Sequence, residues 1–164
     1  MQDNKITQSE GEAKVFELAK EIGSCMFTTV VSKKLHSRPM ATTARPDQHD
    51  FVMLTAKSDP KVAELESQHE VVLNFADGKR KFLALNGTAR LNDDRALIKD
   101  VWSVGAQVFW PNGPTDPNVT AIVITPTHAE YWEGNGGMVA SVKFAYAIAM
   151  HSTPDLGANK KLQM

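Results

Sequence analysis

The chain has 164 residues, of which 42% are hydrophobic and 23% are charged, a composition typical of one compact globular domain or two very small ones. Eighteen basic and nineteen acidic residues give a formal net charge of -1, which excludes a nucleic-acid binder that relies on bulk positive charge. The single cysteine, Cys25, excludes an internal disulfide and a cysteine-rich zinc site.

The first third of the chain is predicted to form a helix followed by strands. Apolar residues at helical spacing predict a helix over residues 7–22. The β-branched and aromatic residues of 25–31 predict a strand, and 37–44 predict a second one. Pro39 weakens that second strand, because proline cannot donate to a ladder and prefers an edge or a bulge. A third strand is expected over 51–56, after a polar loop.

The middle of the chain is predicted to form a short helix and a β-hairpin. The helix is expected to begin after Asp59, since aspartate is a suitable N-cap and Pro60 suits the first helical position. It should end near Gln68. Strands are expected over 70–76 and 81–91, joined by an Asp-Gly turn of the kind that favours hairpins.

The next segment is predicted to continue the strands with a helix and a long loop. Gly87 indicates a bulge or a close approach of backbone within its strand. Asn92 or Asp93 is expected to cap a helix, and a loop is expected to follow over 103–118. Residues 119–132 should supply one or two further strands.

These elements predict a mainly β fold with some helix: a six-stranded antiparallel split β-barrel with peripheral helices. Too few helices alternate with strands for a doubly wound parallel sheet, and closure would remove the sheet edges. Residues 139–150 are expected to form an apolar helix that plugs the barrel or packs against a second chain. The domain is therefore placed at 1–151, with a flexible tail over 152–164.

The sequence predicts a cytoplasmic protein without a membrane or nucleic-acid partner. Its first residues are polar and lack the apolar core of a secretory signal. The longest apolar run, 139–150, contains Lys143 and is shorter than the roughly 20 residues that a membrane span needs.

Four patterns that could carry chemistry are better explained by a structural role. The glycine cluster at 134–137 lacks the third glycine of a dinucleotide fingerprint and is expected to be a flexible turn. The five histidines lack the paired spacing of metal ligands, and no serine lies in a nucleophile elbow. Cys25 opens an apolar strand and is expected to be an unreactive, buried thiol.

A candidate anion site lies between the second predicted strand and the short helix. It combines cations, hydroxyl donors and the free backbone N–H groups of a helix N-terminus, which together suit a phosphate dianion. Its members are Arg38, Thr55, Lys57, Ser58 and Lys61. The alternative is a solvated turn whose lysines face water. Asp59 also opposes an anion, unless its carboxylate points away.

The loop over 109–117 is a candidate binding loop. It contains three prolines and two adjacent aromatic residues, Phe109 and Trp110. Together with Trp132, the loop could stack on a flat aromatic ligand. An anchor in the core or in a dimer interface is an equally consistent interpretation.

Four runs of the chain, in this order, resemble a known family: HSRPMATTA, FVMLTAKSDPKVAEL, EVVLNFADGKRKFLALNGTARLNDD and WPNGPTDPNVTAIVITPTHAEYW. They are similar to the general stress protein 26 group of the pyridoxamine 5'-phosphate oxidase-like, FMN-binding split-barrel superfamily. The resemblance covers roughly residues 10–150. Its most specific pieces are the triplet 38–40, the loop 113–117 and the triplet 130–132.

The resemblance implies a homodimer that holds FMN in a cleft between its two subunits. The flavin phosphate would lie at the candidate anion site, and the strand backbone at 40–43 would lie against the isoalloxazine ring. Trp110 or Trp132 would cover the ring from the partner subunit. The predicted cofactor-binding residues are Arg38, Pro39, Met40, Ala41, Thr42, Leu54, Thr55, Lys57, Ser58, Lys61, Trp110 and Trp132.

The chain departs from the oxidase branch of that superfamily at several positions. Pro60 stands where a second basic phosphate ligand is expected, which should weaken FMN binding unless Lys57 or Arg38 compensates. Phe82 stands where a glutamine near the ring is expected. Oxidases of this branch carry an arginine and a histidine near their C-terminus that grip vitamin B6, whereas the last arginine here is Arg95, so the bidentate clamp is missing. Vitamin B6 oxidation is therefore not expected.

The sequence thus predicts an FMN-binding flavoprotein of the general stress type, acting as an oxidoreductase on an unidentified substrate with a nicotinamide as candidate electron donor. Three alternatives stay open. They are a flavin-binding stress protein without turnover, a reductase that uses the deazaflavin F420 in the same cleft, and an interaction module that has lost its ligand.

Overall fold

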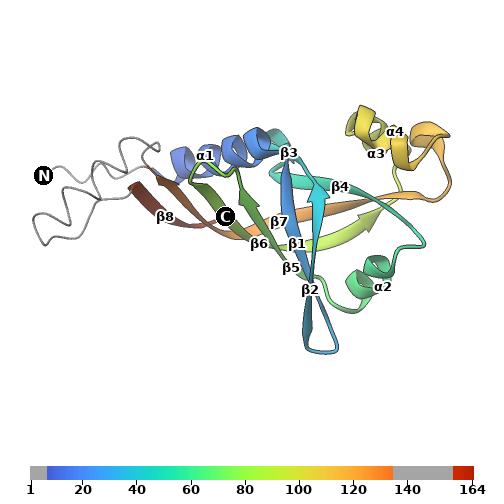
Figure 1. Ribbon diagram of the computed structural model, residues 1–164, viewed down its shortest axis with the longest axis horizontal. Helices are drawn as coiled ribbons and strands as arrows, with labels where there is room; N and C mark the ends of the chain where they lie inside the picture. Colours follow the sequence, from blue (N-terminus) through green and yellow to red (C-terminus); the bar gives the residue numbers. More distant parts are fainter. Residues whose placement is uncertain (1–6, 135–156) are drawn as a thin grey trace, which may run out of the picture.

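The computed structural model describes residues 7–134 and 157–164 and shows a sheet with helices at its periphery (Figure 1). The predicted helix over 139–150 lies outside the described residues. The helices are α1 (Gln8–Ile22), α2 (Pro60–Ser67), α3 (Arg95–Asp100) and α4 (Val104–Phe109). The strands are β1 (Ser24–Val31), β2 (Lys34–Ala41), β3 (Thr43–Arg45), β4 (Asp50–Ala56), β5 (Glu70–Ala76), β6 (Lys81–Asn92), β7 (Val119–Gly134) and β8 (Gly157–Gln163).

The sheet is antiparallel and open within the described residues. Its order is β2-β1-β5-β6-β7-β4-β3, and β8 pairs with the end of β7 that β4 leaves free. The prediction of a mainly β, antiparallel architecture with peripheral helices is confirmed. The strand number is corrected from six to eight, because β3 and β8 were not expected. The flexible tail is corrected as well, since 157–163 pair with β7.

Helix α1 begins and ends where the local sequence predicts. Thr7 accepts a hydrogen bond from the Glu10 N–H while the Glu10 carboxylate reaches back to Thr7, a complete capping box. Gly23 ends the helix in the left-handed region with φ 73°. The buried face of α1, which includes Val15 and Leu18, packs on the sheet.

The β1–β2 hairpin turns earlier than predicted. Ser32 and Lys33 both have positive φ values, 48° and 65°, so two residues suffice for the turn and β2 begins at Lys34 instead of residue 37. The strand then stops at Ala41, and β3 follows as a separate short strand. Pro39 lies on β2, which is an edge strand as proline requires.

One irregularity aligns the long strands β6 and β7. The register shifts between Asn86 and Gly87, which confirms the bulge expected there. Gly87 lies opposite Pro126, so the missing N–H of the proline falls where the ladder is already interrupted. For this reason 119–134 form one continuous strand.

The segment from Asn92 to Asn118 is more structured than predicted. The cap of α3 is Asp94, whose carboxylate accepts the Ala96 N–H, and not Asn92 or Asp93. The expected loop over 103–118 contains α4, which Ser103 caps by accepting the Ala106 N–H at 3.3 Å. Helices α3 and α4 lie together at one end of the sheet (Figure 1).

Two groups of buried apolar side chains fill the molecule. The larger one lies between α1 and the sheet and includes Phe27, Phe51 and Tyr131. The smaller one lies under α3 and includes Ile98 and Val123. In the part of the chain that is described, no helix combines the length and the apolar character needed to cross a membrane.

We predict that Gly87→Ala destabilises the protein by about 1–3 kcal/mol, because a β-carbon there would lie 2.6 Å from the Thr125 carbonyl oxygen. Gly105→Ala is the matched control: its β-carbon meets nothing closer than 3.7 Å, and alanine favours a helix. Urea unfolding of both variants measures the difference. Equal stability of the two variants would contradict the close approach at Gly87.

Candidate functional site

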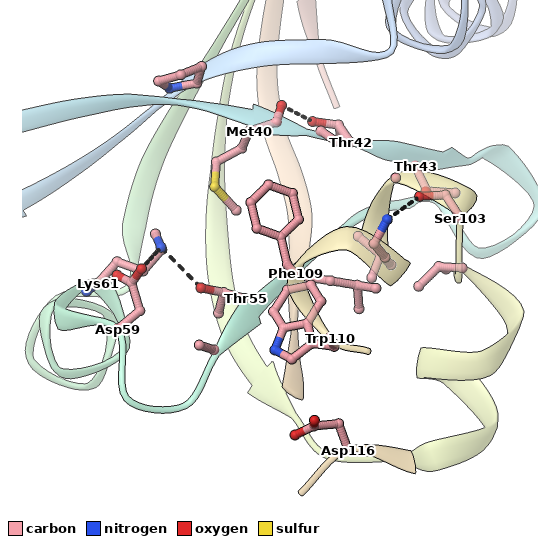
Figure 2. A pocket seen from close by; sticks show the side chains of 18 of the residues that line it. Met40, Thr42, Thr43, Thr55, Asp59, Lys61, Ser103, Phe109, Trp110 and Asp116 are labelled. Carbon is pink, nitrogen blue, oxygen red and sulfur yellow. Dashed lines mark hydrogen bonds and ion pairs between the residues drawn. The ribbon is translucent and has the colours of Figure 1, made fainter. Parts of the chain in front are cut away.

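A cavity of about 870 Å³ lies between the β2–β3 edge, the start of α2 and helix α4 (Figure 2). Its volume falls within the range of roughly 300–1,000 Å³ that is usual for small-molecule sites. One wall is formed by the strand segment from Pro39 to Thr43. The opposite walls come from the end of β4, the first turn of α2 and α4.

The structure brings most of the predicted site residues to this cavity. Those that line it are Pro39, Met40, Ala41, Thr42, Leu54, Thr55, Lys61 and Trp110. Arg38, Lys57, Ser58 and Trp132 are not among the lining residues. The turn after β4 brings the start of α2 to this cavity, so Met40 and Lys61, which are far apart in the sequence, line the same space.

Lys61 supplies the positive charge of the cavity. Its side chain is only 8% exposed, and its ammonium donates to the Thr55 hydroxyl at 3.0 Å and contacts the Asp59 carboxylate. Figure 2 shows all three side chains on one wall. A buried ammonium is costly unless it is paired and hydrogen-bonded, and both conditions are met here.

Asp59 has two roles in this corner. Its carboxylate accepts the Lys61 backbone N–H at 3.0 Å, which caps α2, and it also contacts the Lys61 ammonium. Burial raises the pKa of Asp59, but the hydrogen bonds from Lys61 outweigh it and hold that pKa below its ordinary value. Asp59 is therefore ionised at neutral pH.

Arg38 is held outside the cavity by Glu64. The guanidinium donates to the Glu64 carboxylate at 2.7 Å and to the Thr29 hydroxyl at 2.8 Å. Glu64 lies one helical turn beyond Lys61 and is itself only 10% exposed. Sequence reasoning missed this partner, because nothing in the local pattern connects Glu64 to Arg38.

The other predicted residues also have partners elsewhere. The Lys57 ammonium donates to Asp93 at 2.7 Å. Ser58 lies at the rim, where its backbone N–H donates to the side chain of Asn118, a lining residue, at 3.3 Å. Trp132 lies on β7 opposite Phe82, so it does not reach the cavity of its own chain.

Helix α4 contributes aromatic surface that the sequence analysis placed in a loop. Figure 2 shows the Phe109 ring between Met40 and Trp110, and the Phe109 and Trp110 ring centroids are 6.0 Å apart. Ser103 and Ala106 of the same segment also line the cavity. The Ser103 cap was the local signal that could have revealed this helix.

Cys25 lies next to this region but does not line the cavity. Its thiol is within 3.4 Å of the Thr42 hydroxyl, and burial raises its pKa to about 11. A thiol with that pKa is protonated at neutral pH, as expected for an unreactive, buried cysteine. Within the described residues, no group of three or more His, Cys, Asp or Glu side chains is placed to hold a metal ion.

The site is thus suited to a ligand that has a flat apolar part and a polar end. Aromatic and aliphatic side chains on α4, β2 and β4 offer a surface for a ring system, and Thr42 and Thr43 offer polar groups beside it. Lys61 and Thr55 offer hydrogen-bond donors at one end.

The antiparallel sheet and the cavity at its edge define the chain as a mainly β protein with a cleft of the size usual for small molecules. The chain belongs to the pyridoxamine 5'-phosphate oxidase like family, whose model matches residues 10–155. This confirms the resemblance found in the sequence. No curated protein matches the chain.

Solved structures with a similar fold include three whose chains match over more than nine tenths of their own length. A provisionally assigned general stress protein 26 from Jannaschia sp. CCS1 is 21% identical, with a TM-score of 0.79 over 95% of this chain and 99% of that one. The general stress FMN/FAD binding protein from Xanthomonas citri is 22% identical, with a TM-score of 0.69 over 79% and 92%. A pyridoxamine 5'-phosphate oxidase-related, FMN binding protein from Nostoc punctiforme is 12% identical, with a TM-score of 0.63 over 98% and 99%.

We predict that Glu64→Gln lowers the free energy of unfolding by about 1–3 kcal/mol at pH 7, because it leaves the Arg38 guanidinium without its counter-ion. Burial raises the pKa of Glu64, but hydrogen bonds from Thr29 and Arg38 lower it below its ordinary value of 4.5. The unfolded chain therefore binds a proton first as pH falls, so this stabilisation is present above pH 4.5 and is lost below it.

Denaturation of the wild type and the Glu64→Gln variant at several pH values tests this expectation. The difference between them should shrink as the pH drops from 7 to below 4.5. Glu66→Gln, an exposed position on the same helix, is the control and should change little. A difference that stays constant with pH would contradict the role of Glu64.

Proposed function

We propose that the chain is an FMN-binding flavoprotein that holds its flavin in the cavity between β2, α2 and α4. The observation that carries the proposal is the buried Lys61 ammonium at one end of a cavity whose other walls are largely apolar and aromatic. FMN has the same division, with a phosphate at one end and a flat ring at the other. The FMN-binding relatives from Xanthomonas citri and Nostoc punctiforme share the fold.

Each wall of the cavity would then contact a different part of FMN. Lys61 and Thr55 would donate to the phosphate, and main-chain groups of residues 40–42 would meet the polar edge of the ring. Phe109 and Trp110 would contact the ring face. A bound flavin supplies hydride and electron transfer, so the activity we propose is that of an oxidoreductase with a nicotinamide as electron donor.

A flavin carrier without turnover is the second candidate. The described residues that line the cavity include no histidine, cysteine or tyrosine, which are common proton donors, and Asp59 is paired with Lys61. Anaerobic mixing of the flavin-loaded protein with NADH and NADPH separates the two candidates. Bleaching of the flavin band would support the oxidoreductase, and no bleaching with either donor would support the carrier.

We predict that Lys61→Ala lowers the affinity for FMN about tenfold or more, because it leaves the Asp59 carboxylate without its counter-ion beside the ligand phosphate. Lys57→Ala is the matched control, because the Lys57 ammonium is paired with Asp93 outside the cavity. Quenching of flavin fluorescence on titration measures both variants. Equal losses in the two variants would remove Lys61 from the phosphate end, and no flavin binding by the wild type would overturn the proposed function.

We also propose a homodimer that covers the open side of the cavity. Val104, Val108 and Phe109 on α4 are 90%, 79% and 75% exposed, an apolar face beside the site. Apolar groups gathered in this way are typical of an interaction surface. A second copy of the chain would bury them, and its Trp132 is a candidate to reach the flavin.

We predict that Val108→Asp converts the dimer to monomers, because a charge in an apolar interface is not compensated. FMN affinity should fall with it if the cavity is completed by the partner. Val108→Thr, which keeps the shape without a charge, should remain dimeric. Light scattering after size exclusion gives the mass of each variant, and a wild type that is monomeric at micromolar concentration would contradict the proposal.

A further inference from the structure

The groups expected to receive a ligand phosphate already have partners within the chain. At the start of α2, Pro60 has no N–H, the Lys61 N–H donates to the Asp59 carboxylate at 3.0 Å, and the Val62 N–H donates to the Asp59 carbonyl at 3.0 Å. The first turn of this helix therefore has no free backbone donor for an anion.

The side-chain cations are satisfied as well. The Lys61 ammonium is held by Asp59 and Thr55 on the cavity wall, as Figure 2 shows. Arg38 is turned to Glu64 and Thr29. A phosphate that entered this corner would have to replace the Asp59 carboxylate on Lys61 or lie beside it as a second negative group.

The charge of the cavity points the same way. Among the described residues that line it, the charged ones are Lys61, Asp59 and Asp116, one cation against two carboxylates. The phosphate dianion of FMN thus gains little from this environment, and riboflavin, whose ribityl chain ends in an uncharged hydroxyl, loses little by lacking it. Its hydroxyl groups can exchange hydrogen bonds with Thr55, Ser58 or Asn118 at the same end.

We infer that Asp59 is a specificity-determining residue: as the built-in counter-ion of Lys61, it makes the cavity accept riboflavin about as well as FMN. This inference rests on the proposed function, since it assumes that a flavin binds here. Lys61 is almost fully buried, so it needs a counter-ion whether or not ligand is present. Asp59 provides it, and the ligand phosphate then has little left to neutralise.

The test compares the affinities of FMN and riboflavin for the wild type and for Asp59→Asn. Asparagine caps a helix as well as aspartate does, so the variant keeps the start of α2 while removing the charge. Asp94→Asn is the matched control, the same change at the cap of α3, whose aspartate does not line the cavity. Fluorescence titration of each purified, flavin-free protein gives both dissociation constants.

We expect the wild type and Asp94→Asn to bind the two flavins within about tenfold of each other, and Asp59→Asn to favour FMN by a further factor of about ten. A wild-type preference for FMN well above tenfold, or a preference in Asp59→Asn that rises less than about threefold over the control, overturns the inference alone. Failure of the wild type to bind either flavin overturns the proposed function and this inference together. Asp59→Ser, a second neutral cap, is used if Asp59→Asn does not fold.

Discussion

The arrangement of the site depends on one constraint, the burial of the Lys61 ammonium. A cation that is removed from water must be paired, and here the partner is the aspartate that also caps the helix carrying it. The same two residues thus start α2, fix its position against β4 through Thr55, and set the charge of the cavity. The pair thus links the start of the helix to the charge of the cavity.

The sheet provides the rest of the cavity. Strand β2 ends at Ala41 and β3 begins at Thr43, and the residues around this break line the cleft. Helix α4 faces this edge and brings two aromatic side chains to it. The apolar surface that α4 leaves in solvent is continuous with the cavity, which is why ligand binding and association of two chains are coupled in our proposals.

The two predicted cationic phosphate ligands, Lys61 and Arg38, are placed differently by residues one turn apart on α2. Lys61 points into the cavity, whereas Glu64, three positions later, draws Arg38 away from it. Both cations therefore have acidic partners from the same short helix. This internal neutralisation distinguishes the cleft from an anion site with free cations, and it is the basis of our proposal on which form of flavin the cavity accepts.

Local signals in the sequence determined much of the fold. The capping box and Gly23 set α1, Asp59 and Pro60 set the start of α2, and Gly87 marked the bulge. These features depend on near neighbours, so one stretch of chain contains the whole physical cause. The resemblance of the ordered runs to a known family, which the family model confirms, identified the architecture.

Only the tertiary structure decided which charged side chains pair with each other and which strand pairs with the end of β7. That Glu64 takes Arg38, that Asp93 takes Lys57, and that β8 pairs with β7 are contacts between segments far apart in the chain. A charged side chain can pair with any opposite charge that lies close to it, and the distances between charges are set only once the strands have paired. The sequence therefore determined which residue types were available to the site, while the packing of α2 and α4 against the β2 edge determined which of them face the cavity.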